Sequence, residues 1–178
     1  MNTPIAPAPV VTLDPWEYDH AHHVGIRRST ANWQVADTAA YRNDRKQDER
    51  TASPAAAIAE LAVAKHLGLY WPATVWVRSA HSRYRHLPDV FPNIEVRRVR
   101  DRRNRVAVRA KDLGKGLVLV AAHPIGEEFR EVEILGFLPV EEAWEIGTEV
   151  PFDSFDSTRG VTVSQMHPMS TWPGSAVA

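Results

Sequence analysis

The chain has 178 residues, a formal net charge of −1 and no cysteine. A chain of this length can bury one sizeable hydrophobic core, and without cysteine it can form no disulfide framework, thiolate zinc site or thiol nucleophile. No apolar run reaches the ~18 residues that a membrane span needs, and residues 1–11 lack the basic segment of a signal peptide, so we expect a cytoplasmic protein that does not enter the membrane.

The first predicted elements are a tail and a helix. Residues 1–12 are rich in proline and are expected to form a disordered tail. Asp14 and Pro15 then have the residue types of an N-cap and a first helical position, so they predict the start of a helix. Gly25 is expected to end that helix, because glycine is common at the left-handed position after a helix.

The clearest helix is predicted for residues 53–67. Ser53 can act as its N-cap, Pro54 suits its first turn and Gly68 suits the position after its end. The sequence between them is apolar nearly all round, which is typical of a buried helix. Glu60 interrupts the apolar surface, and a buried carboxylate needs a partner or a cation.

The remainder of the chain alternates in the manner of strands. Strands are predicted at 74–78, 93–98, 106–109, 116–122 and 130–138, a short helix at 140–146, and a strand or arm at 162–172. The continuous apolar run at 116–122 is typical of a central strand covered on both faces. Together these elements predict an α/β protein with a central mixed sheet flanked by helices. The expected domain spans residues 13–150, with residues 151–178 as a C-terminal extension.

The candidate chemistry lies at Asp89, Glu95 and Arg97. The period of two along a strand places Glu95 and Arg97 on one face. Asp89 and Glu95 could bind Mg²⁺ through oxygen, with Glu60 completing or ordering the metal shell. The cation of Arg97 could offset charge that develops on a phosphoryl group. This spacing therefore indicates metal-assisted hydrolysis of a phosphodiester.

The same residues carry a resemblance to a known family. The matching pieces are AIAELAVAKHLGLYW, PDVFPNIEVRR, RVAVRAKD, GLVLVAA and VEILGFLPVEEA. In this order and spacing they resemble small phage proteins of the PD-(D/E)XK nuclease superfamily. The family's helical Glu falls on Glu60, and its acidic pair falls on Asp89 and Glu95. The resemblance implies a restriction-endonuclease-like core, cleavage of DNA with Mg²⁺ or Mn²⁺, and a phage protein acting in the host cytoplasm.

The chain departs from this family at Arg97, where the superfamily has a Lys. Arginine stays protonated at any usable pH, so Arg97 can hold a phosphate but cannot act as a base. If the chain turns at residues 102–103, Lys111 would lie opposite Glu95 on the neighbouring strand. Lys111 is therefore the alternative candidate for the catalytic cation.

Charge is unevenly distributed along the chain. Residues 78–111 contain 11 Lys and Arg against 3 Asp and Glu, whereas residues 127–156 contain one Arg against 10 acids. The candidate contacts to DNA phosphates are Arg98, Arg100, Arg102, Arg103, Arg105 and Arg109. Few aromatic residues apart from Tyr84 interleave this stretch, so a base-stacking platform is not indicated. Equally, the two stretches could neutralise each other as neighbouring strands and loops.

Two other functions remain open on the sequence. One is a catalytically inactive nuclease-like module that binds DNA or a host protein, which the Arg97 substitution favours. The other is a small accessory or structural phage protein in which the charge asymmetry drives self-assembly as a homo-oligomer. Convergence of Glu60, Asp89 and Glu95 within the distance at which they could share a metal ion would favour the nuclease over both.

Overall fold

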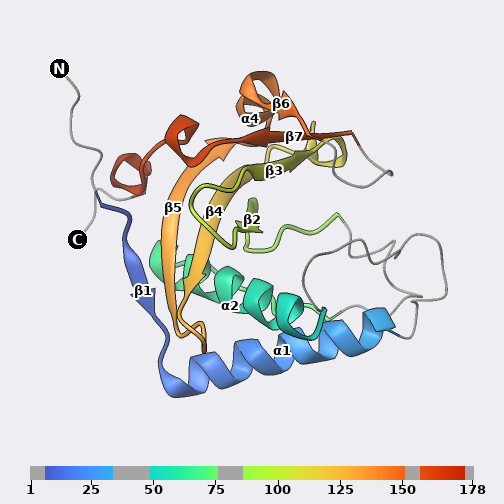
Figure 1. The fold of residues 1–178 in the computed structure, drawn as a ribbon, viewed down its shortest axis with the longest axis vertical. Coiled ribbons are helices and arrows are strands. Elements are labelled where there is room, and N and C mark those ends of the chain that lie inside the picture. Colours follow the sequence, from blue (N-terminus) through green and yellow to red (C-terminus); the bar gives the residue numbers. More distant parts are fainter. Residues whose placement is uncertain (1–6, 34–48, 76–85, 151–156, 175–178) are drawn as a thin grey trace.

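The computed structural model describes residues 7–33, 49–75, 86–150 and 157–174 (Figure 1). Its α-helices are α1 (Pro15–Trp33), α2 (Glu49–Leu67) and α4 (Val140–Ile146). Its strands are β1 (Val10–Thr12), β2 (Ile94–Arg98), β3 (Val106–Arg109), β4 (Val118–Ile125), β5 (Glu131–Pro139), β6 (Thr148–Glu149) and β7 (Thr158–Val161). Within the described residues no helix is long and apolar enough to cross a membrane.

The strands form two sheets. The main sheet has the order β1-β5-β4-β2 and the second sheet has the order β3-β7-β6. In the main sheet β2 runs parallel to β4, whereas β4–β5 and β5–β1 are antiparallel. The predicted α/β class with a mixed sheet is therefore confirmed.

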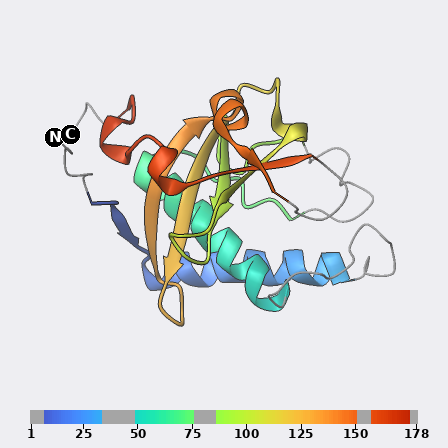
Figure 2. The ribbon, with the colours of Figure 1, turned by 45° about the horizontal axis from the view of Figure 1, so that its top comes forward.

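The main sheet is the middle of three layers. Helices α1 and α2 cover one face, and the second sheet with α4 covers the other (Figures 1 and 2). Alternate residues of β4 reach both cores: Val120 and Ala122 pack with α2, while Leu119 and Ala121 pack with the second sheet and α4. This confirms that the apolar run at 116–122 contains a central strand covered on both faces.

The predicted end of helix α1 at Gly25 is wrong, because the helix continues to Trp33. A Cβ atom at Gly25 would lie 2.2 Å from Cα of Pro54 and 2.7 Å from the carbonyl oxygen of Ser53. Glycine is needed here because the backbones of α1 and α2 almost touch. Helix α2 likewise begins earlier than predicted, at Glu49, so Pro54 lies inside the helix and not in its first turn.

The expected boundaries of the domain also change. The prediction of a disordered tail through residue 12 is wrong for Val10–Thr12, which pair with β5 as an edge strand. Residues 158–161 form β7 between β3 and β6, so this part of the expected extension belongs to the fold. Strands this short leave little periodic signal, and their partners lie far away in sequence.

Two further segments were predicted in part. In the expected strand at 74–78, residues 74 and 75 are not in a strand and residues 76–78 lie outside the described residues. Residues 162–172 form 3-10 helices and one bridge between His167 and Phe137 of β5, so they are an arm packed on the main sheet.

Candidate functional site

Asp89 lies along the outer edge of β2. The other edge of β2 pairs with β4, and on the outer edge the Ile94 N–H donates to the Val90 carbonyl (2.9 Å). The Val96 N–H donates to Oδ2 of Asp89 (2.9 Å). The Asp89 carboxylate thus accepts a hydrogen bond that the carbonyl of a neighbouring strand would otherwise accept. It therefore lies at the edge of the sheet and not on either face.

Glu60 approaches this edge from α2 and is only 6% exposed. Its Oε1 accepts a hydrogen bond from Arg28 of α1 (2.7 Å), and its Oε2 accepts one from the indole N–H of Trp71 (2.9 Å). Arg28 also donates to the Thr74 carbonyl (2.9 Å). The buried carboxylate therefore has a cationic partner, as burial requires, and this partner comes from α1.

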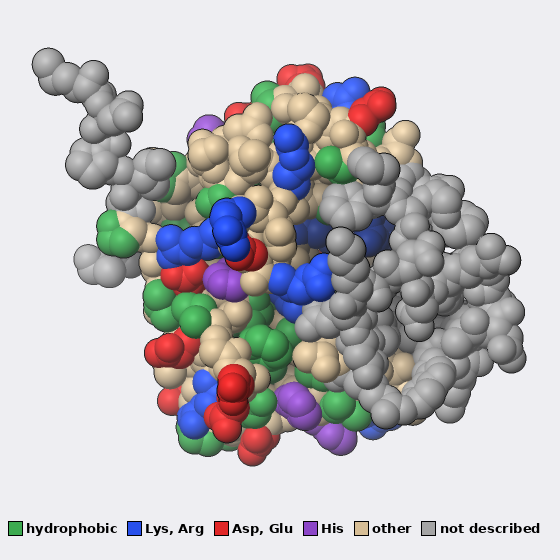
Figure 3. Space-filling view, viewed as in Figure 1, with side chains coloured by type: hydrophobic (Ala, Val, Ile, Leu, Met, Phe, Trp, Pro, Cys, Tyr) green, Lys and Arg blue, Asp and Glu red, His purple; other side chains and the backbone are tan. Residues whose placement is uncertain are grey.

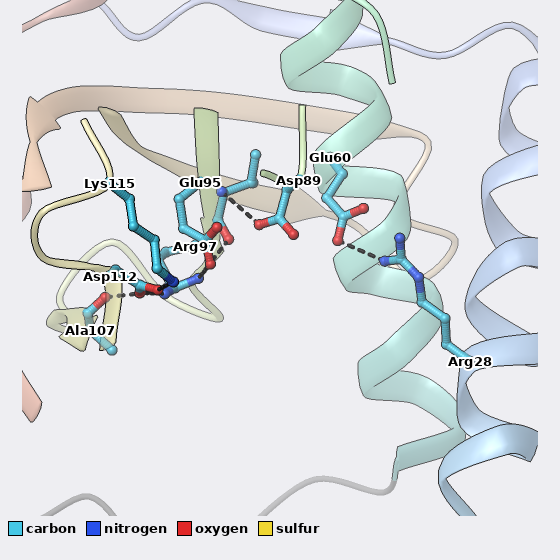
Figure 4. A network of polar contacts seen from close by, with 9 residues as sticks. Arg28, Glu60, Asp89, Glu95, Arg97, Ala107, Asp112 and Lys115 are labelled. Atoms are coloured by element: carbon cyan, nitrogen blue, oxygen red, sulfur yellow. Dashed lines mark hydrogen bonds and ion pairs between the residues drawn. The ribbon is translucent and has the colours of Figure 1, made fainter. Parts of the chain in front are cut away.

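The three predicted carboxylates border one region. Asp89 lies between Glu60 and Glu95 (Figure 4). Burial, followed by the negative charges of Glu60 and Glu95, raises the pKa of Asp89 well above its usual range, against the opposing influence of Arg97 and the Val96 N–H. In the described part of the chain, however, no group of three or more His, Cys, Asp or Glu side chains is placed to hold a metal ion.

Arg97 connects this edge to the second sheet (Figure 4). Its guanidinium donates to Glu95, to Oδ2 of Asp112 (2.7 Å) and to the Ala107 carbonyl in β3 (3.1 Å). Asp112 is 3% exposed and also lies 3.6 Å from Nζ of Lys115. Sequence reasoning missed Asp112, because only the docking of β2 against β3 reveals that its carboxylate is buried beside Arg97.

Lys111 does not lie opposite Glu95 on a paired strand. Strand β3 pairs with β7 and not with β2, and Lys111 belongs to the 3-10 helix Ala110–Asp112 that follows it. Lys111 is exposed, yet its ammonium interacts electrostatically with residues of the site. Partial burial and the cations of Arg109 and Arg97 lower the pKa of Lys111, while Asp112 and Glu95 act in the opposite direction.

Several of the arginines proposed to contact phosphates have partners within the protein. Arg102 pairs with Glu133, Arg103 with Asp101, and Arg105 with Thr148 and the Gly160 carbonyl. Arg100 and Arg109 are exposed, and Arg98 is half-buried. On the face seen in Figure 3, Lys and Arg side chains lie in separate groups with acids beside several of them, not as one continuous basic surface.

Comparisons with protein-family models, with curated proteins and with solved structures find no match to this chain. The site itself combines hard oxygen donors at Asp89 and Glu95 with the cations of Arg97 and Lys111. Oxygen donors suit Mg²⁺ or Mn²⁺, and cations beside them suit a phosphate.

Proposed function

We propose that this protein is a Mg²⁺- or Mn²⁺-dependent nuclease that hydrolyses DNA phosphodiesters, with a restriction-endonuclease-like core of the PD-(D/E)XK superfamily and a phage origin. The observation that carries the proposal is the position of Asp89 between Glu60 and Glu95 (Figure 4). Three carboxylates at one edge of a sheet repel one another. A bound divalent cation would offset that repulsion.

The residues present fit such a cation. Mg²⁺ commonly takes only one or two protein carboxylates and completes its shell with water and substrate phosphate, so Asp89 and Glu95 are a sufficient pair. Glu60 has both oxygens engaged, by Arg28 and Trp71, and would act behind this pair by adding negative charge. The cation, when bound, polarises a phosphoryl oxygen and lowers the pKa of a water.

The other side chains have separate roles in the hydrolysis. The oxygen of water forms a bond to phosphorus while the water loses a proton to solvent, the bond from phosphorus to one sugar oxygen breaks, and that oxygen takes up a proton from solvent. Arg97 is directed into the protein and holds Glu95 in place, which makes it a positioning residue. Lys111 is exposed and would supply a cation to a phosphate.

Nicking of supercoiled plasmid in Mg²⁺ or Mn²⁺ tests the proposal. Asp89→Asn and Glu95→Gln keep the shapes of the side chains and their hydrogen-bond acceptors but remove the charge that binds a cation. We expect each to lower nicking by about 100-fold or more, since even a residue behind the metal ligands is worth 10- to 100-fold. Glu145→Ala, on α4 across the main sheet, is the matched control and should not change the rate. Nicking that survives both site variants would contradict the proposal.

A second candidate is a non-catalytic nuclease-like module that binds DNA or a host protein. It is favoured by the internal contacts of Arg97, whose guanidinium is already engaged by Glu95, Asp112 and Ala107. A site whose charges are neutralised from within the protein need not bind a metal. Binding of DNA without nicking by the wild-type protein in either metal would select this module.

A further inference from the structure

An exposed tyrosine contacts a half-buried phenylalanine close in sequence to residues of the candidate site. Tyr70 is 69% exposed, although tyrosine commonly buries much of its ring. Its ring contacts that of Phe91, with centroids 6.1 Å apart and planes inclined by 47°. The two residues come from segments 21 positions apart, and the Phe91 N–H donates to the Tyr70 carbonyl (2.9 Å), which holds the two backbones together.

The chain itself connects this pair to the candidate site. Tyr70 immediately precedes Trp71, whose indole donates to Glu60. Phe91 follows Asp89 by two residues, and two residues of chain span at most about 7 Å. Tyr70 is therefore one residue away in sequence from a partner of Glu60, and Phe91 is two residues away from Asp89.

We infer that Tyr70 and Phe91 form a stacking subsite for a nucleobase, so that the substrate is single-stranded or locally unpaired DNA. This inference rests on the proposed nuclease function and specifies its substrate. An exposed aromatic face binds bases with little regard to sequence, because every base has a π face that can stack on it. Bases inside a duplex are already stacked on both faces, whereas an unpaired base can turn its face to a protein ring.

The rigidity of the pair supports this role. Tyr70 has few rotatable bonds, its ring contacts that of Phe91, and its carbonyl accepts a hydrogen bond from the Phe91 N–H. A ring that is already fixed loses little conformational freedom when a base binds. A phosphate held at Asp89 and Glu95 would place an adjacent base near Tyr70.

The test is fluorescence anisotropy with a labelled short single strand, with Ca²⁺ in place of Mg²⁺ to prevent cleavage. We expect the wild type to bind the single strand more tightly than the blunt duplex of the same sequence. Tyr70→Ala should weaken binding to the single strand by roughly tenfold. Tyr70→Leu, which keeps an apolar side chain against Phe91, should weaken it as well, and Tyr70→Phe should restore it. Ile146→Ala, an exposed apolar residue on α4, is the control for surface truncation.

A strand with abasic positions separates stacking from a structural role. On that strand the wild type and Tyr70→Ala should bind equally, because no base is present to stack. Equal binding of the base-containing strand by wild type and Tyr70→Ala, the same loss on the abasic strand, or preference for the duplex would each overturn the inference. None of these results would alter metal-dependent nicking that is lost in Asp89→Asn, so the nuclease proposal would stand. No binding and no nicking of any DNA would remove both.

Discussion

Replacing Gly25 by alanine tests whether the backbones of α1 and α2 really touch. In an ordinary helix this substitution stabilises the protein by about 1 kcal/mol, because alanine has the higher helix propensity. Here the new Cβ would lie 2.2 Å from Cα of Pro54, whereas ordinary contact begins at 3.4 Å. The two helices would have to separate by about 1.2 Å, and the nearest atoms belong to backbone that cannot rotate away.

The test is therefore whether Gly25→Ala raises or lowers the free energy of unfolding. Overpacking of this kind costs about 1–3 kcal/mol and sometimes more, so we expect Gly25→Ala to destabilise the protein by about 2 kcal/mol. For a domain of this size the melting temperature should fall by roughly 4–8 °C. His23→Ala, at an exposed position of the same helix, should change stability by no more than about 0.5 kcal/mol. A higher melting temperature for Gly25→Ala would refute the close packing of the helices.

Three further variants probe the charges of the site. Arg28→Met should destabilise the protein by about 3–5 kcal/mol in urea unfolding, because it leaves the buried carboxylate of Glu60 without its cation; Arg27→Met, at an exposed position, is the control, and equal effects would contradict the prediction. Because the pKa of Asp89 is raised in the folded protein, Asp89 contributes most to the free energy of unfolding below pH ~4. This contribution declines as the pH rises through the folded-state pKa. Asp89→Asn should therefore flatten the fall in unfolding free energy between acidic and neutral pH, and an unchanged pH profile would contradict this. Lys111→Ala should reduce the salt dependence of DNA affinity by a slope of about one if its ammonium contacts a phosphate, whereas an unchanged slope would exclude that contact.

Local patterns predicted the elements that carry the candidate site. The buried helix around Glu60, the alternating strand with Glu95 and Arg97, and the short helix at 140–146 all appear in the structure, because each has a period or an apolar run of its own. Helix ends were less predictable. Gly25 has the residue type of a helix end, yet its neighbour Pro54 lies almost thirty positions away in the sequence.

The contacts between distant segments were beyond sequence reasoning. Arg28 as the partner of Glu60, and Asp112 as the partner of Arg97, each depend on how two elements pack. The expected hairpin that would have placed Lys111 opposite Glu95 does not form, since β3 pairs with β7 near the end of the chain. The alternation of apolar and polar residues indicates that a segment forms a strand, but it does not indicate which other strand it pairs with.

The sequence by itself determined which residue types are available: a carboxylate in an apolar helix, an acidic pair with an arginine two positions on, and strands whose alternation separates their faces. Periodicity is a local property, so these features can be read before the chain folds. Only the tertiary structure decided that Asp89 lies between Glu60 and Glu95, and that the rings of Tyr70 and Phe91 contact each other. These arrangements follow from the packing of α2 and of the turn at residues 91–93 against β2, and packing is a property of the whole chain.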